Sequence, residues 1–303
     1  MRVGLALPQL GPHVDGAVVR GFAERAEEIG FGHLFVQQHL FYPHEVVSGY
    51  SARPGLAVPE PYRSVLQPLE MLAAVAAWTS EVLVGTSILV AGYHRPVDLA
   101  QRITTLDVLS GGRTVFGFSV GWSDEEHAQY DVNPRTRGKR AGELIDALKA
   151  CWGPDPVMFA GEFFQIPTSD IDPKPVQKPH PPLMSGMRSE VGLKRTAEQF
   201  DWWNPASGTL EQHLATMADL ATMRPSELEP LKMCWNLFTV PPVIVANLQP
   251  LSVDQLSEQV AQAAAAGVDA VSIDANFDPA LGSTEAWLAE PDRLAPVLDA
   301  AVR

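Results

Sequence analysis

Short apolar runs alternate with longer segments that carry apolar residues at helical spacing along this 303-residue chain. The apolar runs predict strands that begin near Val3, Leu34, Val82, Thr114, Pro182, Asp201, Lys232 and Ala270. The helical spacing predicts helices over residues 16–29, 66–79, 139–152, 189–199 and 253–266. Eight such units favour an α/β fold, a (β/α)8 TIM barrel formed by residues 1–303 as a single domain. A doubly wound sheet is disfavoured because LPQLGPHVDG, and not GxGxxG, follows the first strand.

The stretch 81–122 contains a complete strand, helix and strand. Residues 82–88 are apolar without alternation, which predicts a strand buried on both faces of a parallel sheet. A helix is expected to begin at Pro96 and to end at the glycine pair 111–112. Residues 114–118 predict the next buried strand, and small residues follow it directly. Small residues at strand ends allow a ligand to approach the backbone closely.

Two proline-rich segments, residues 41–68 and 153–181, interrupt the alternation and predict long loops. We expect them to be long insertions that begin at the carboxyl ends of strands two and four. Barrel enzymes place their sites at this face. Both segments are therefore candidate substrate walls. Surface insertions without a role in binding are the alternative.

Acidic residues number 36 against 22 basic ones, which gives a net charge of −14. This charge disfavours binding to nucleic acid or to an anionic membrane. The first residues lack a secretory pattern and no run of 18 uncharged apolar residues follows, so we expect a cytoplasmic protein. Cys151 and Cys234 fall in a predicted helix and a predicted strand, which indicates reduced core residues. We expect no metal site, because HEVVS at 44–48 lacks the second histidine of HExxH.

The chain resembles the bacterial luciferase-like flavin monooxygenase family in the segment TSILVAGYHRPVDLAQRITTLDVLSGGRTVFGFSVGW at 86–122. Weaker matches follow in the family's order, including MRVGLALPQ at the start, FGHLFVQQH at 31–39 and DPKPVQKPHPPLMSGMRS at 172–189. They are similar to the actinobacterial branch, many of whose members use the deazaflavin coenzyme F420. The resemblance implies a homodimeric oxidoreductase that uses coenzyme F420 for hydride transfer to or from a small-molecule substrate. An FMN-dependent monooxygenase is the alternative that it leaves open.

His39 is the candidate catalytic residue, at the end of the second predicted strand. Imidazole titrates near neutrality, so a histidine in a barrel mouth is able to donate or accept a proton. The resemblance implies this role, because deazaflavin-using relatives carry an Asp-His pair here. Gln38 replaces that aspartate. Its amide is expected to hydrogen-bond the cofactor, but it does not hold a neighbouring cation by charge.

The resemblance also implies a set of cofactor contacts around the third and fourth strands. The bulge beneath the cofactor ring is expected at Thr86, Ser87 and Ile88. In relatives this bulge contains a cis peptide bond, which here corresponds to the bond between Ser87 and Ile88. The backbone near the pyrimidine edge and the pocket wall are expected at Ser119, Val120, Gly121 and Trp122.

An anion site is expected where the fifth strand ends and a helix begins, at Gly186, Met187, Arg188 and Ser189. Free amides at a helix start, a hydroxyl and a guanidinium together bind phosphate. The alternative is helix capping by Ser189, and both are compatible. A basic cluster at Arg135, Arg137, Lys139 and Arg140 forms either an ionic surface or a contact with the cofactor's acidic tail.

Two other classes of function remain open. GFSVG at 117–121 matches the GxSxG elbow of serine hydrolases after a strand, but no HGGG-like segment precedes it. The downstream histidines His127, His180 and His213 also lack an aspartate at a matching strand end. A non-catalytic binding barrel is the other alternative. The acidic run 124–127 is expected to be a solvated turn.

Overall fold

Eight parallel strands close into a barrel in the computed structural model, which describes residues 1–46, 49–53, 55–242 and 250–302. Around the barrel the strands follow the order β1-β10-β9-β8-β7-β4-β3-β2. Their bounds are Arg2–Ala6 (β1), His33–Val36 (β2), Leu83–Val90 (β3), Thr114–Ser119 (β4), Leu183–Ser185 (β7), Trp202–Trp203 (β8), Lys232–Phe238 (β9) and Ala270–Asp274 (β10). All eight begin within one residue of the predicted positions, so the predicted TIM barrel is confirmed.

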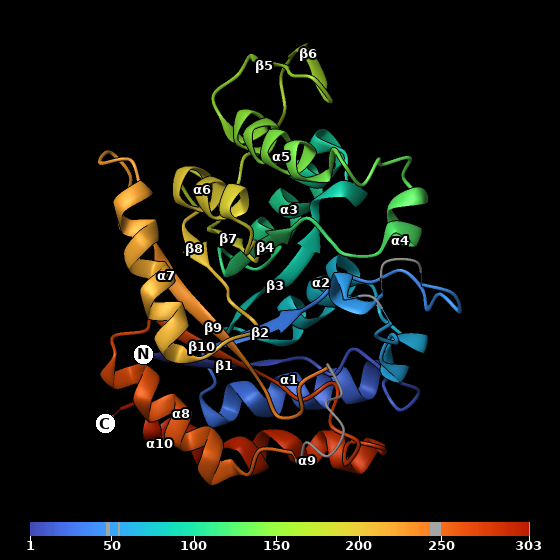
Figure 1. Ribbon diagram of the computed structural model, residues 1–303, viewed down its shortest axis with the longest axis vertical. Helices are drawn as coiled ribbons and strands as arrows, with labels where there is room; N and C mark the ends of the chain where they lie inside the picture. The colour runs from blue at the N-terminus through green and yellow to red at the C-terminus, as the bar shows by residue number, and fades with distance from the viewer. Residues whose placement is uncertain (47–48, 54, 243–249, 303) are drawn as a thin grey trace.

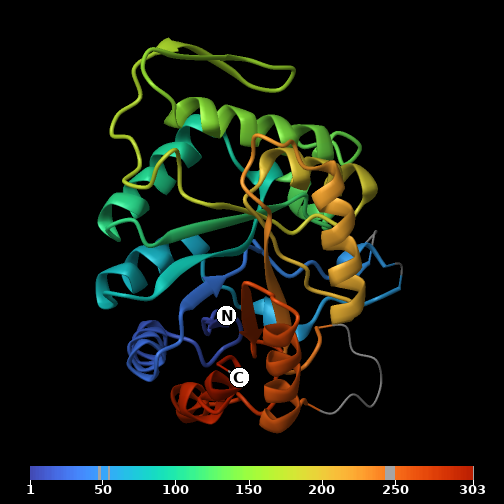
Figure 2. The ribbon, with the colours of Figure 1, turned by 90° about the vertical axis from the view of Figure 1, so that its left-hand side faces the viewer.

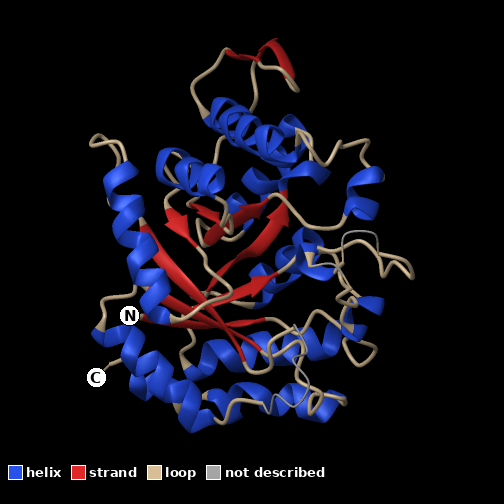
Figure 3. Ribbon diagram, viewed as in Figure 1, coloured by secondary structure: helices blue, strands red, loops and turns tan. Residues whose placement is uncertain are grey.

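Helices form the outer layer around these strands (Figures 1 and 3). Their bounds are Gly16–Ile29 (α1), Pro68–Trp78 (α2), Pro96–Leu109 (α3), Asp124–Ala128 (α4), Arg137–Trp152 (α5), Glu190–Gln199 (α6), Leu210–Met223 (α7), Val253–Ala265 (α8), Thr284–Leu294 (α9) and Val297–Ala300 (α10). The two chain ends lie near each other on one side of the barrel (Figure 2).

Helix α1 illustrates how the sequence sets these boundaries. Asp15 caps its start by accepting hydrogen bonds from two backbone amides of the first turn. Gly30 ends it with φ of 104°, a left-handed conformation that favours glycine. Its buried residues Val18 and Phe22 belong to the same apolar cluster as Leu5 of β1, so one face of the helix packs on the barrel.

The bulge predicted in β3 is present, as a register shift between Thr86 and Leu89 opposite β4. The Ser87–Ile88 peptide bond is cis, as predicted. Glycine is required at position 117, because a Cβ atom there would lie 2.3 Å from the Thr86 carbonyl oxygen. The Thr86 hydroxyl donates to the Gly117 carbonyl (3.1 Å) and accepts from its N–H (2.9 Å). These contacts fix the bulge against β4.

The first long insertion, between β2 and α2, includes two 3-10 helical turns, Tyr50–Ala52 and Glu60–Arg63. Within it, residues 47–48 and 54 lie outside the described residues. Leu10, beyond the end of β1, pairs with Val65, and Tyr62 packs in an apolar cluster with Phe277. The segment is therefore attached to the carboxyl ends of the strands.

The second insertion is placed differently from the expectation. Residues 153–181 follow helix α5, not strand β4, and so lead back to the amino ends of the strands. They include an antiparallel pair, β5 (Val157–Ala160) and β6 (Gln165–Ser169), which lies beyond α5 at the top of Figure 1. The Gln177 amide donates to the carbonyl of Thr114, the first residue of β4 (2.9 Å). The prediction of a substrate wall at 153–181 is therefore wrong.

Cys151 and Cys234 are free and buried, as predicted. Among the described helices, none is long and apolar enough to cross a membrane.

Candidate active site at the carboxyl ends of the strands

A cavity of about 940 Å³ opens at the carboxyl ends of the strands. Its lining comes from the residues at or after seven strands, β2, β3, β4, β7, β8, β9 and β10, together with residues 50–53 and Tyr62 of the first insertion. Barrel enzymes bind their ligands at this face, and the volume falls at the upper end of the range for cofactor sites.

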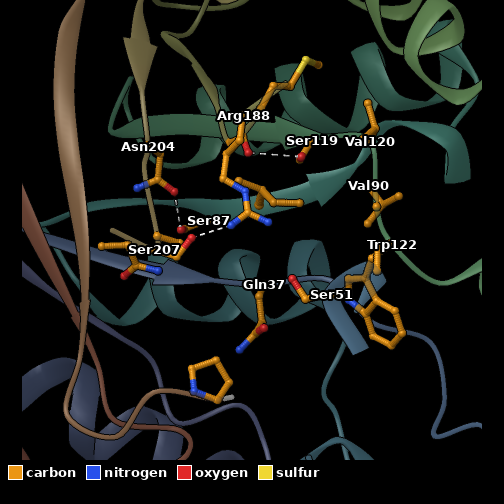
Figure 4. Close-up of a pocket in the computed structure, with 18 of the residues that line it drawn as sticks. Gln37, Ser51, Ser87, Val90, Ser119, Val120, Trp122, Arg188, Asn204 and Ser207 are labelled. Atoms are coloured by element: carbon orange, nitrogen blue, oxygen red, sulfur yellow. Dashed lines mark hydrogen bonds between the residues drawn. The ribbon is translucent and has the colours of Figure 1, made fainter. Parts of the chain in front are cut away.

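The structure brings the predicted site residues together in this cavity, with one exception. The predicted residues that line it are Gln38, His39, Ser87, Ile88, Ser119, Val120, Gly121, Trp122, Gly186, Met187, Arg188 and Ser189. Figure 4 shows Ser87, Ser119, Val120, Trp122 and Arg188 among them. Thr86 is the exception: it is fully buried, does not line the cavity, and bonds Gly117 instead. Thr86 therefore supports the bulge and offers no contact to a ligand.

His39 is paired with a buried carboxylate that the sequence analysis missed. Its Nδ1 lies 3.2 Å from Oε1 of Glu126, which is 1% exposed. The same oxygen accepts from the Leu40 N–H (2.9 Å), and Oε2 accepts from the Tyr93 hydroxyl (2.7 Å). Because Nδ1 is engaged, Nε2 is the ring nitrogen left to exchange a proton with a ligand.

The expectation of a solvated turn at 124–127 is therefore wrong. These residues begin helix α4, in which Glu126 and His127 are buried. A signal was present in the sequence: Ser123 followed three residues later by Glu126 matches the S-x-x-E pattern of a helix start. The Ser123 hydroxyl does accept from the Glu126 N–H (3.1 Å), while the Glu126 side chain turns to His39.

Opposing effects act on the pKa of Glu126. Burial raises it, but hydrogen bonds from His39, Leu40 and Tyr93 outweigh burial, so the pKa lies below its usual value. The pKa of Tyr93 is raised by burial and by the Glu126 carboxylate beside it. At neutral pH the group is thus an ionised carboxylate held between a neutral phenol and the His39 imidazole.

Aromatic rings surround His39. Its ring centroid lies 4.2 Å from that of Tyr62 and 5.6 Å from that of Trp122. The Gln67 amide donates to the His39 carbonyl (2.9 Å). The ring is thus held on several sides in one orientation.

Gln38 uses its side-chain oxygen within the protein. Oε1 accepts from the Val90 N–H (2.9 Å) and lies 3.0 Å from Nε2 of His94. Burial lowers the pKa of His94 to about 4, so its imidazole is neutral and donates through Nε2. Only the amide nitrogen of Gln38 is left for a ligand.

The bulge forms a firm surface inside the cavity. The Ser87 hydroxyl donates to Oδ1 of Asn204 (2.7 Å; Figure 4). The Asn204 amide in turn donates to the Cys234 carbonyl (2.7 Å). A Cβ atom at Gly186 would lie 3.1 Å from the Ile88 side chain, so glycine lets that side chain lie close to the backbone that follows β7. Asn204, at the end of β8, is a second residue that the sequence analysis missed.

The predicted anion site is only partly available. The Gly186 N–H donates to the Phe118 carbonyl (2.9 Å) and the Met187 N–H to the Ser185 hydroxyl (3.2 Å). Ser189 caps α6 by accepting from the Gly192 N–H (3.2 Å). Helix capping by Ser189 is thus confirmed, whereas phosphate contact stays a prediction that depends on Arg188, which donates to the Ser207 hydroxyl within the cavity (Figure 4).

Three further arginines line the same cavity: Arg53, Arg137 and Arg195. Of the predicted basic cluster, only Arg137 does so. Arg195 lies between α6 and α5, because a Cβ atom at Gly142 would be 2.9 Å from its Nε. A concentration of guanidinium groups at this side suits a ligand with more than one negative charge.

The serine hydrolase alternative is not supported by the geometry. The Ser119 hydroxyl donates to the Gly186 carbonyl (3.4 Å). His127 and His180 bond the Ser123 and Pro181 carbonyls through Nδ1. Over the described ranges, no histidine hydrogen-bonds Ser119. The described residues also contain no group of three or more His, Cys, Asp or Glu side chains able to hold a metal ion.

Comparison with known proteins connects this cavity to a family. The family model described as luciferase-like monooxygenase matches residues 4–240. An uncharacterized protein of Mycobacterium tuberculosis strain H37Rv is 30% identical over 201 residues, which are 65% of this chain and 71% of that protein. The FMNH2-dependent dimethylsulfone monooxygenase of Pseudomonas putida is 25% identical over 261 residues, 82% of this chain and 67% of that one. The F420-dependent glucose-6-phosphate dehydrogenase of Kineococcus radiotolerans is 31% identical over 159 residues, 52% and 43% of the two chains.

Solved structures agree on the fold. Monooxygenase RslO1 from Streptomyces bottropensis has a TM-score of 0.77 at 18% identity, with all of both chains covered. An F420-dependent secondary alcohol dehydrogenase in complex with an F420-acetone adduct has a TM-score of 0.76 at 14% identity, with 99% of this chain and 98% of that chain covered. At these identities the likeness supports the barrel and no particular activity.

Proposed function

The chain belongs to the luciferase-like monooxygenase family, and we propose that it is an oxidoreductase that uses coenzyme F420 for hydride transfer to or from a small organic substrate. The observation that carries the proposal is the His39–Glu126 pair, which lies in the same cavity as the Ser87–Ile88 bulge. When bound, the cofactor supplies the hydride chemistry. The chain supplies position, a proton at His39 and a partly enclosed cavity.

The roles of the residues follow from their contacts. Ile88 and Ser87 would support the ring of the cofactor, and the Ser87 hydroxyl is held in place by its hydrogen bond to Asn204. His39 exchanges a proton with the substrate through Nε2, and the Glu126 carboxylate stabilises the charged imidazole that forms. Tyr93 holds the carboxylate from its other side.

The arginines are the reason to prefer coenzyme F420 to FMN. Both molecules carry a phosphate that suits Arg188, but the deazaflavin also has an acidic tail. Arg137 and Arg195 line the cavity in addition to Arg188, and Arg137 also forms an ion pair with Asp124 (3.2 Å). Three guanidinium groups suit a ligand that carries a phosphate and a further negative charge. The F420-dependent relative supports the same choice.

FMN remains the second candidate, for a specific reason. Gln38 stands where deazaflavin-using relatives carry an aspartate, and its oxygen is committed to Val90. The match to the FMNH2-dependent relative also extends over 82% of this chain. An FMN-dependent monooxygenase would use the same bulge and the same arginine.

Titration of the purified chain with coenzyme F420 and with FMN, side by side, tests the proposal. We expect saturable binding of the deazaflavin at micromolar concentration. Replacement Arg137→Ala should weaken it about tenfold, as expected for one charge-assisted contact, and leave FMN binding nearly unchanged. Arg135→Ala is the matched control, because Arg135 is exposed and does not line the cavity.

Two outcomes of the titration would contradict the choice of coenzyme F420. If FMN binds at micromolar concentration, is reduced, and is reoxidised with consumption of oxygen, while the deazaflavin shows no saturable binding, the first choice fails. The FMN-dependent monooxygenase then takes its place. If neither molecule binds, the chain is a binding barrel without either cofactor.

A further inference from the structure

Asp274, at the end of β10, is a buried carboxyl group for which the proposed reaction gives no role. It is 6% exposed and lines the cavity. Among the described residues, the hydrogen bonds to its side chain come from the N–H and the side-chain amide of Asn276 (both 2.9 Å), and both go to Oδ1. Over the described parts of the chain no basic side chain forms an ion pair with it. Oδ2 therefore remains for a ligand.

Burial raises the pKa of Asp274, and the two bonds from Asn276 oppose this only in part. An isolated buried carboxylate is costly, because the protein replaces few of the hydrogen bonds that water gives it. A positively charged group beside Oδ2 would remove this cost. No basic side chain among the described residues lies within ion-pair distance of it.

The surroundings of Asp274 are aromatic. In the sheet it pairs with Phe238 of β9, and Phe277 follows three residues later. The Phe277 ring lies 5.5 Å from that of Tyr62 and 6.1 Å from that of Phe238, and all three line the cavity. Aromatic faces attract cations, and they do so most strongly where water is excluded.

Asp274 belongs to a different part of the barrel from the strands that lead to three of the four cavity arginines. In the barrel order, β10 lies four strands from β4 and three from β7, the strands whose following segments carry Arg137, Arg188 and Arg195. Asp274 and Ser87 also line a common smaller cavity in the barrel interior. Asp274 therefore shares a lining with the bulge, and its strand does not adjoin the strands that lead to Arg137, Arg188 and Arg195.

We infer that the substrate carries a cationic nitrogen, an amine or quaternary ammonium group, which binds between Asp274 and the rings of Phe238, Phe277 and Tyr62. This inference rests on the proposed function, because it takes the space between Asp274 and the bulge to be the substrate side of the cavity. The cation pairs with Oδ2 of the Asp274 carboxylate. The apolar remainder of the substrate lies against the aromatic side chains.

Two matched pairs of probes test the inference on the purified chain: benzylamine with benzyl alcohol, and cyclohexylmethylamine with cyclohexylmethanol. Each pair differs by the charge that a primary amine carries at about pH 7. Affinity is measured by calorimetry for the unsubstituted chain, for Asp274→Asn and for Asp278→Asn. Asparagine retains the oxygen that accepts from Asn276, so the first variant should fold. Asp278 is a buried carboxyl four residues on that does not line the cavity.

We expect each amine to bind about tenfold to a hundredfold more tightly than its alcohol, the range for a hydrogen bond to a charged group. Asp274→Asn should abolish this preference and Asp278→Asn should retain it. Equal affinity for amine and alcohol, absent binding of both pairs, or a preference that survives Asp274→Asn overturns the inference. Cofactor titration of the same samples separates the two proposals, since cofactor binding without amine preference refutes only this one.

Discussion

Replacement of Glu126 by Gln changes one buried carboxylate into a neutral amide of nearly the same shape. In the protein this carboxylate accepts hydrogen bonds from His39, Leu40 and Tyr93 over 2.7–3.2 Å. A hydrogen bond to a charged acceptor contributes about 1.5–3 kcal/mol and a neutral one about 0.5–1.5 kcal/mol. With the amide oxygen in the place of Oε1, the bonds from His39 and Leu40 become neutral, and the new NH2 group must donate to the Tyr93 hydroxyl. The three bonds therefore lose roughly 3 kcal/mol, and the lower cost of burying an amide offsets part of this. We expect the free energy of unfolding to fall by about 1–3 kcal/mol.

The effect on turnover should be larger than the effect on cofactor binding. A positioned proton donor contributes about 10²–10⁴-fold to a rate, and Glu126 orients and stabilises this one. We therefore expect kcat on an identified substrate to fall about tenfold to a hundredfold, with cofactor affinity changed by less than about threefold. Glu125→Gln is the control, because Glu125 is adjacent and does not line the cavity.

Steady-state kinetics and a cofactor titration on the same samples provide the assay. If Glu126→Gln keeps kcat within about twofold while stability falls as expected, the carboxylate is structural and the proposed proton path is wrong. If kcat and cofactor affinity fall together by the same factor, the cavity has been distorted. Tyr93→Phe distinguishes these outcomes, because it retains the carboxylate and removes one hydrogen bond.

Three further predictions follow from the same geometry. His39→Asn should lower kcat more than it weakens cofactor binding, and unchanged turnover would assign His39 to packing. The stability that ionised Glu126 contributes should be complete above the unfolded pKa of about 4.3, and it should be lost as pH falls through the lower pKa of the folded state. The difference in unfolding free energy between the unsubstituted chain and Glu126→Gln should therefore become smaller in acid, and a difference that stays constant with pH contradicts this. Gly117→Ala should destabilise the fold by about 1–3 kcal/mol in thermal unfolding, because its Cβ would lie 2.3 Å from the Thr86 carbonyl oxygen, and an unchanged melting temperature would show that the bulge gives way.

The sequence alone determined the barrel and its local features. Each strand and each predicted helix carries its own periodic pattern, so strand starts were predicted to within one residue. The Ser87–Ile88 bulge and the Ser189 cap were predicted because family resemblance or short-range chemistry specifies them. Most of the predicted site residues converge because parallel strands in a barrel end at one face.

Only the tertiary structure decided which polar groups meet. Glu126 contacts His39 across 87 positions in the chain, and Asp274 faces the cavity from the last strand. A buried carboxylate has no periodic signal, because its burial depends on partners supplied by other strands. Residues 153–181 likewise lie toward the amino ends of the strands because helix α5 comes between β4 and this segment. The pattern of apolar and polar residues along the chain determines each helix and strand. Closure of the barrel determines which side chains lie together in the cavity at the carboxyl ends of the strands.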